Sequence, residues 1–486
     1  MITFADLAKD VAIKVWGFHP NRQIRPVHFA NGFVRALAGT RGSPDLLQKV
    51  AAGYRRGKVG TTNQQLVEDL RDQFEWKDES LAADSVAELR SALDLVLNQD
   101  KAFFPSGFQW SMTLTHPALA TSDPSDQGSG KFVAELLAAS KDETIVETLR
   151  TILIRPNDNI WILTSPLLRE TDLGLPPVPS SDLIKRLAVS PHLLKLQNAF
   201  STLCQHGPLL EKTMFLQRAV TLGAFGLFLQ LVRLRKLGTD YPEPVPILIC
   251  SPSPLPEVRE ASRSSFVRCR QSIEVAFEIG LKQEMKDSNQ DQLSRSKYRE
   301  LAHDWLPDLE QNGKDRPKAQ QVWNRFLEDF EGFGLGTDVP FEAFLRAAVR
   351  AAFVAMRLTG GEDPEGAARV IARTIGLLYP RKGGSGERYF LPSPQFLDTL
   401  VVSLLEPGEE IPVEEFWDRA YDHFGIICGA HGTTDAQRLA TWGIRKVTPT
   451  HLQENAKGVL GELVRMGHAT EYPDDIAMIR AGGGQS

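Results

Sequence analysis

Hydrophobic residues recur three or four positions apart along most of this chain, which is the spacing of one buried face of an α-helix. Residues 246–250, Pro-Ile-Leu-Ile-Cys, depart from that spacing and form a short continuous apolar run typical of a buried strand. The pattern therefore predicts a mainly α protein. The expected helices cover residues 4–16, 28–38, 43–56, 64–74, 81–98, 131–139, 142–153, 182–237, 257–286, 319–333, 341–358 and 364–378.

Breaks in this pattern predict several domains. A chain of 486 residues is long enough for two to four, each with its own core. Intervals rich in Pro, Gly or Ser at 122–130, 173–181 and 381–386 suggest boundaries, and the polar stretch 287–318 is expected to be partly disordered. The predicted parts are an N-terminal helical domain at 1–121, a linker and helical connector at 122–181, a central helical domain with one strand at 182–380, and a C-terminal domain at 389–486.

The C-terminal domain contains the clearest local signal. Thr448 can cap a helix, and Pro449 suits the first helical turn, where a missing N–H costs nothing. Apolar residues then follow at helical spacing, and Gly467 is placed to end the helix in a left-handed conformation. Residues 469–480, with a turn at 473–475, have the pattern of a short hairpin.

This order of helix, glycine and hairpin resembles the winged-helix family. The resemblance implies a recognition helix whose surface residues read base edges or contact phosphates. However, the tip of the hairpin is Asp474-Asp475, and residues 389–486 carry seven Lys/Arg against fourteen Asp/Glu. A winged helix that contacts protein is therefore an equal alternative to one that reads DNA. The candidate surface residues are Arg445, Lys446, His451, Gln453, Asn455 and Lys457.

Charge is unevenly distributed along the chain, whose net charge is −6. Residues 1–60 carry ten Lys/Arg against three Asp/Glu, whereas residues 61–100 carry three against ten. The basic segment, interleaved with aromatic residues, could bind phosphates and bases, or it could pair with the acidic segment that follows. The faces Arg259/Arg263/Arg270 and Arg346/Arg350/Arg357 are further candidates. The proposed N-terminal patch consists of Arg22, Arg25, Arg35, Arg41, Arg55, Arg56 and Lys58.

No catalytic signature of comparable strength is present. The His303-Asp304 pair in a helical context is the alternative that would make the chain a metal-dependent hydrolase, but the sequence selects no further ligands. His423, Cys428 and His431 are closely spaced, but a zinc site needs three or four converging ligands, and Cys428 lies in an apolar run. The segment 125–132 lacks the residues of a phosphate-binding loop. We therefore expect no cofactor, no metal and no catalytic residues.

Taken whole, a helical body with a terminal winged module and no catalytic signature resembles subunits of bacterial anti-phage defence systems in methylation-associated or BREX-like clusters. This resemblance implies a non-catalytic, nucleic-acid-associated subunit of a multi-protein complex, with a pure protein scaffold as the alternative. The four cysteines show no disulfide framework, and the apolar stretch 214–234 is interrupted by polar groups that a bilayer disfavours. We expect a cytoplasmic protein that does not bind membranes.

Overall fold

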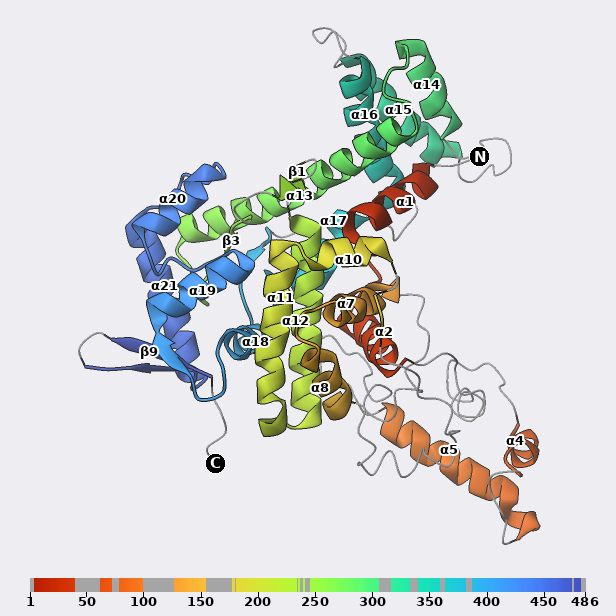
Figure 1. The fold of residues 1–486 in the computed structure, drawn as a ribbon, viewed down its shortest axis with the longest axis vertical. Coiled ribbons are helices and arrows are strands. Elements are labelled where there is room, and N and C mark those ends of the chain that lie inside the picture. Colours follow the sequence, from red (N-terminus) through yellow and green to blue (C-terminus); the bar gives the residue numbers. More distant parts are fainter. Residues whose placement is uncertain are drawn as a thin grey trace. The chain divides into compact units, whose positions relative to one another are not determined.

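The structure is a computed structural model, shown in Figure 1, and it confirms the mainly α class. Its strands are only two to four residues long. The chain divides into two compact units, which are considered separately: unit 1 comprises residues 1–24, 190–196 and 224–482, and unit 2 comprises 25–189, 197–223 and 483–486. The structure describes residues 4–39, 62–71, 78–98, 126–153, 177–179, 181–233, 235–236, 239–240, 245–305, 316–332, 340–358, 363–381, 387–473 and 476–481.

Unit 2 is helical. In it, the backbone of α2 (Pro26–Ala38) packs closely against the start of α7 (Ser129–Ala138), in the segment rich in Gly and Ser. Residues 122–130 have the composition of a loop or linker; of these the structure describes 126–130, where Asp126 and Ser129 are buried at 6% and 0% exposure and Gly128 is exposed. The Asp126 carboxylate accepts hydrogen bonds from Ser129 Oγ at 2.6 Å and Gly130 N at 2.9 Å. The helices of unit 2 are α2 (Pro26–Ala38), α4 (Asn63–Asp69), η1 (Glu79–Leu81), α5 (Ala82–Asn98), α7 (Ser129–Ala138), α8 (Thr144–Leu153), α10 (Asp182–Ala188) and η6 (Gly207–Leu209).

Two apolar helices, α11 (Pro191–His206) and α12 (Lys212–Val232), contribute residues to both units. The sequence predicted an almost continuous helix over 182–237, but the structure breaks it at Val189-Ser190 and again before Lys212. Among the described helices, α12 is long and apolar enough to cross a membrane, and 89% of its most apolar window is buried inside the protein. The core helix of a soluble protein passes the same test of length and composition.

The spine of unit 1 is α13 (Pro256–Asp287), a helix of 32 residues that the periodicity predicted almost to the residue. Its side chains also complete the hydrogen bonds of the buried strand β3 (Ile247–Leu248). Ser262 Oγ donates to Leu248 O at 2.7 Å and accepts from Phe390 N at 2.9 Å, while Ser265 Oγ accepts from Leu248 N at 3.2 Å. Buried backbone groups need such partners, so these serines allow short strands to end against the helix.

Near the C-terminal end of α13, further helices of unit 1 pack around aromatic side chains. Tyr298 stacks on Phe344 with ring centroids 4.5 Å apart, and Phe277 meets Phe353 edge-on at 5.4 Å. Within the stretch 287–318, which we expected to be partly disordered, residues 295–304 form a helix that buried Tyr298 anchors. The helices of this region are α1 (Phe4–Trp16), α14 (Arg295–Asp304), α15 (Arg316–Gly332), α16 (Pro340–Leu358) and α17 (Pro364–Thr374).

The C-terminal part of unit 1 combines short strands with helices. β6 (Glu410–Pro412), β8 (Ala469–Glu471) and β9 (Ala477–Arg480) form an antiparallel sheet in the order β6-β9-β8. The predicted hairpin is thus present, and it follows three helices. The remaining elements are α18 (Pro394–Leu404), α19 (Val413–Phe424), α20 (Thr433–Thr441), α21 (Pro449–Arg465), β7 (Ile426–Ile427), the antiparallel pair β4 (Leu378–Tyr379) and β5 (Tyr389–Phe390), and the pair β1 (Arg235–Lys236) and β2 (Thr239–Asp240).

This part shares a core with a segment far upstream. β3 pairs in parallel with β7, so that Ile247 lies beside Ile426. The boundary expected near residue 389 therefore does not coincide with the edge of a compact unit. One apolar cluster contains Leu248, Cys250, Val258 and Ala261 together with Tyr421, Ile427, Leu439, Ile444, Val447 and Leu452.

Candidate functional site

The exposed surface of α21 is the first candidate site, and its local structure follows the sequence closely. Thr448 Oγ1 caps the helix by accepting from His451 N at 3.3 Å, and Pro449 occupies the first turn. Leu452, Val459 and Leu463 are buried on one face. Opposite them, Gln453 and Lys457 are exposed, as are Arg445 and Lys446 before the helix.

The cations of this surface are free to meet a ligand. Within the part of the chain that the structure describes, the side chains of Arg445, Lys446 and Lys457 have no hydrogen bond or ion pair. By contrast, Arg465 near the end of α21 is paired with Glu462, and Arg438 on α20 is paired with Asp435 at 3.1 Å. Exposed Glu454 lies on the same face as Lys457, so the positive charge is concentrated around the start of the helix.

Asn455 corrects the sequence analysis. It was expected on the surface of the recognition helix, but it is 3% exposed. Its Nδ2 donates to Ile249 O at 2.9 Å and Cys428 O at 2.8 Å, and its Oδ1 accepts from Ser251 N at 2.8 Å. The amide therefore ties α21 to the ends of β3 and β7 and cannot read a base. His451 is half-buried, and its Nδ1 is buried without a hydrogen-bond partner.

The hairpin offers a different kind of surface. Tyr472 is 47% and Ile476 is 53% exposed, and Tyr472 N donates to Ile476 O at 2.9 Å. Between them, Asp474 and Asp475 lie outside the described residues. Large apolar side chains this exposed are suited to a protein partner.

The N-terminal basic patch is only partly within the described chain. Arg22 belongs to unit 1, where it forms an ion pair with Asp363. Arg25 and Arg35 belong to unit 2; Arg25 is exposed, and burial lowers the pKa of Arg35. Arg41, Arg55, Arg56 and Lys58 lie outside the described residues, so the patch as a whole stays a prediction.

The two metal-site candidates do not assemble. The His303 ring packs edge-on against Trp323, with centroids 5.5 Å apart. His423 Nδ1 is 3.0 Å from Arg419 O, whereas His431 Nε2 is 3.1 Å from Asp418 Oδ1. Burial raises the pKa of the Cys428 thiol well above its ordinary value, which disfavours the thiolate that zinc needs. Among the described residues, no cluster of three or more His, Cys, Asp or Glu could hold a metal ion.

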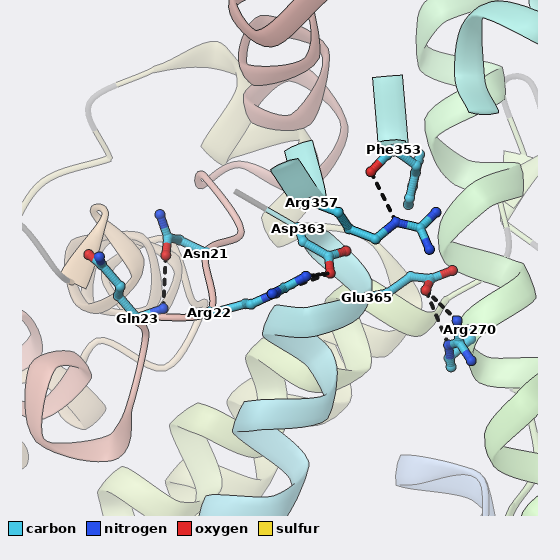
Figure 2. Close-up of polar contacts among 8 residues, drawn as sticks. All are labelled: Asn21, Arg22, Gln23, Arg270, Phe353, Arg357, Asp363 and Glu365. Carbon is cyan, nitrogen blue, oxygen red and sulfur yellow. Dashed lines mark hydrogen bonds and ion pairs between the residues drawn. The ribbon is translucent and has the colours of Figure 1, made fainter. Parts of the chain in front are cut away.

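A second candidate site, shown in Figure 2, surrounds the start of α17 in unit 1. Arg22 and Arg270 approach two buried carboxylates from opposite sides. Arg22 donates to Asp363 Oδ2 from Nη2 at 2.6 Å and from Nε at 3.2 Å. Arg270 Nη2 lies 2.5 Å from Glu365 Oε2. Asp363 holds the N-cap position of α17 but makes no capping bond, because its carboxylate is turned to Arg22.

Arg369, one turn further along α17, extends this second site. Burial lowers its pKa, and so do the neighbouring guanidinium groups of Arg388, Arg22 and Arg270, while Asp363 opposes them. Arg369 is half-buried, and within the described chain its side chain has no hydrogen bond or ion pair. We call Arg22, Arg270, Arg369 and Arg388 the arginine cluster.

A polar cavity of about 1140 Å³ lies in the same region, between α13, α15 and α16. Glu274 lines the cavity and lies close enough to Glu365 for that carboxyl to affect its pKa. Burial and the Glu365 carboxyl raise the pKa of Glu274. Arg357 also lines the cavity; its Nε donates to Phe353 O at 3.1 Å (Figure 2).

The sequence also proposed two arginine-bearing helix faces, on α13 and on α16, as nucleic-acid contacts. On α13, Arg263 forms an ion pair with Glu387, and on α16, Arg350 forms an ion pair with Asp329.

Sequence reasoning missed this second site as a unit. Arg22 and Arg270 were separate candidates for nucleic acid, and nothing in the sequence connects them to Asp363, Glu365 or Arg369. Gly366 is the residue near Asp363 whose lack of a side chain is linked to this site. A Cβ there would lie inside 3.0 Å of Arg22 Nε and Asp363 Oδ2.

Comparisons with protein-family models, curated proteins and solved structures give no match to this chain.

Proposed function

We propose that this chain is a non-catalytic binding protein and that residues 410–480 form a winged helix that contacts nucleic acid. The winged-helix assignment is supported by three helices, α19, α20 and α21, that are followed by the hairpin β8–β9. β6 completes the sheet. The His303 ring packs edge-on against Trp323, an environment that favours binding over metal-dependent hydrolysis as the proposal.

One observation carries the nucleic-acid contact: Arg445, Lys446 and Lys457 are exposed and, within the described chain, unpaired. Unpaired cations can neutralise phosphates without first breaking an internal ion pair. The start of α21 adds the partial positive charge of the helix dipole, although Pro449 has no N–H and His451 N donates to Thr448 Oγ1. Because Asn455 is buried and Glu454 is exposed on the same helix, the proposed contact is with the phosphate backbone and lies at the start of α21.

The test is the salt dependence of binding to a labelled 20-base-pair duplex and to a single strand, measured by fluorescence anisotropy. Replacing Arg445, Lys446 and Lys457 by Glu should weaken binding more than tenfold. It should also reduce the slope of log K against log salt by about two to three, since each phosphate contact contributes roughly 0.9. Unchanged affinity and slope in this variant would rule out the proposed interface.

A matched control makes the same change of charge elsewhere in unit 1. Lys9, Lys286 and Lys297 are exposed, and within the described chain they have no ion pair. Their triple replacement by Glu should leave at least the slope unchanged. An equal loss in both variants would show that net charge, and not this surface, determines binding.

Protein contact is the second candidate function, and the exposed Tyr472 and Ile476 side chains favour it. It would suit the place in a multi-subunit bacterial defence complex that the layout of the sequence suggests. This function predicts no salt-sensitive binding to either nucleic acid. It also predicts that Tyr472→Ser with Ile476→Ser abolishes co-purification of the partner subunit while the Glu triple variant retains it.

A further inference from the structure

The cationic surface at the start of α21 continues onto a helix that lies outside the winged module. We propose that Arg268 of α13 supplies a further phosphate contact, so that the nucleic-acid interface is composite and extends from the C-terminal module onto the long helix of unit 1. This inference rests on the proposed function of Arg445, Lys446 and Lys457. It adds a residue that the spacing of charges along the sequence did not select.

The first argument is the position of the Arg268 guanidinium group beside the turn that precedes α21. A Cβ built on Gly443 would lie 2.7 Å from Arg268 Nη2, so the guanidinium group lies directly against this turn. Gly443 also has a φ of +77°, a conformation that favours glycine. Arg445 follows two residues later, which is at most about 7 Å along the chain. Arg268 therefore adds its charge to the same surface as Arg445.

The second argument is that a shared core fixes this arrangement. Ile444 and Val447 are buried in the same apolar cluster as Val258 of α13. The two exposed cations between them are therefore anchored to the helix that carries Arg268. Cations held in place before binding lose little freedom when a ligand arrives, which favours affinity.

The third argument is that Arg268 keeps its charge available for a ligand. Its side chain is half-buried, and within the described chain it forms no ion pair. Its Nη1 donates to Gln271 Oε1 at 2.8 Å, and because this partner is neutral, the bond orients the guanidinium group without neutralising it. Arg263 on the same helix differs, since it is paired with Glu260 and Glu387.

The test uses the full chain and the salt titration of the labelled 20-base-pair duplex. Arg268→Gln should reduce the slope of log K against log salt by about 0.9, the contribution of one phosphate contact. Between about 50 and 200 mM salt, the variant should therefore lose roughly threefold less affinity than the unmodified chain. Arg268→Lys keeps the charge and should keep the slope.

The matched control is Arg259→Gln. Arg259 is exposed on the same helix, and within the described chain its side chain has no hydrogen bond or ion pair. It precedes Arg268 by nine residues, or about two and a half turns, so it lies on the opposite side of α13. Arg259→Gln should leave the slope unchanged, and a loss as large as that in Arg268→Gln would show that net charge and not this position determines binding.

The outcomes separate this inference from the proposed function. An unchanged slope in Arg268→Gln, with binding lost in the Glu triple variant of Arg445, Lys446 and Lys457, would overturn the composite interface alone. Unchanged binding in the triple variant would overturn the α21 interface itself. Equal Tm values of Arg268→Gln and the unmodified chain would show that a changed slope reflects the loss of a contact and not of the fold.

Discussion

The pKa of Glu274 depends on burial and on the charged groups beside the arginine cluster. Glu274 lies half-buried on α13, and its pKa is raised by burial and by the nearby Glu365 carboxyl. The charged form is therefore less favourable in the folded chain than in the unfolded chain. Arg350 and Arg357 oppose this effect but do not reverse it.

The sign of the pH dependence follows from this raised pKa. Because the folded chain holds the Glu274 proton more tightly than the unfolded chain, stability is lost as the pH rises from the ordinary value of 4.5 through the folded pKa. Glu274→Gln removes that loss, so Tm at pH 7.5 should rise by roughly 1–3 °C. The gain should shrink as the pH approaches 4.5. Glu300→Gln on an exposed surface is the control, and a Glu274→Gln variant with an unchanged or lower Tm at pH 7.5 would contradict the argument.

Between elements, the contact of α2 with α7 depends on glycine. A Cβ on Gly130 would lie inside 3.0 Å of Phe33 N and Phe29 O, both of which belong to the backbone of α2. Backbone atoms cannot move aside as a flexible side chain can. The two helices therefore pack so closely because position 130 has no side chain, although the segment has the composition of a linker.

Gly130→Ala should consequently force α2 and α7 apart. Overpacking of this kind costs about 1–3 kcal/mol or more, which urea unfolding followed by circular dichroism can measure. Gly461→Ala on α21 is the matched control, because nothing lies within 4 Å of its added Cβ. The control should be neutral or stabilising by up to ~1 kcal/mol, as expected when Ala replaces Gly in a helix. Equal effects of the two substitutions would show that the close approach is unimportant.

At the scale of the molecule, the C-terminal helices depend on a strand that precedes them by some 180 residues. β3 pairs with β7, Asn455 bonds to Ile249 and Ser251, and Leu248 lies in the same apolar cluster as Leu439 and Leu452. Residues 387–481 alone would leave Asn455 with only Cys428 O among its present partners. Unpaired polar groups and a missing part of the core both destabilise such a fragment.

A fragment of residues 387–481 should therefore lack cooperative unfolding by itself. Addition of a peptide of residues 245–287, which carries β3 and α13, should restore dispersed amide signals in NMR spectra. The same peptide with Leu248→Asp is the control and should fail, because it places a charge in the shared core. A fragment that folds without any peptide would show that the C-terminal part is self-sufficient.

The sequence by itself determined most of the described helices, the buried strand and the C-terminal order of helix, glycine and hairpin, whereas the predicted helix 43–56 lies outside the described residues. These features depend on residues a few positions apart in the sequence. The spacing of apolar residues predicts the helices, Thr448 predicts where α21 begins, and Gly467 predicts where it ends. The tertiary structure decided which polar residues are available for function. Asn455 follows Glu454 in the sequence, yet only the fold buries it against β3. Arg22 and Asp363 are 341 positions apart, and only folding pairs them and leaves Arg369 without a partner in the described chain. A charge or amide has no preferred partner until packing supplies one, so no local pattern could have assigned these roles.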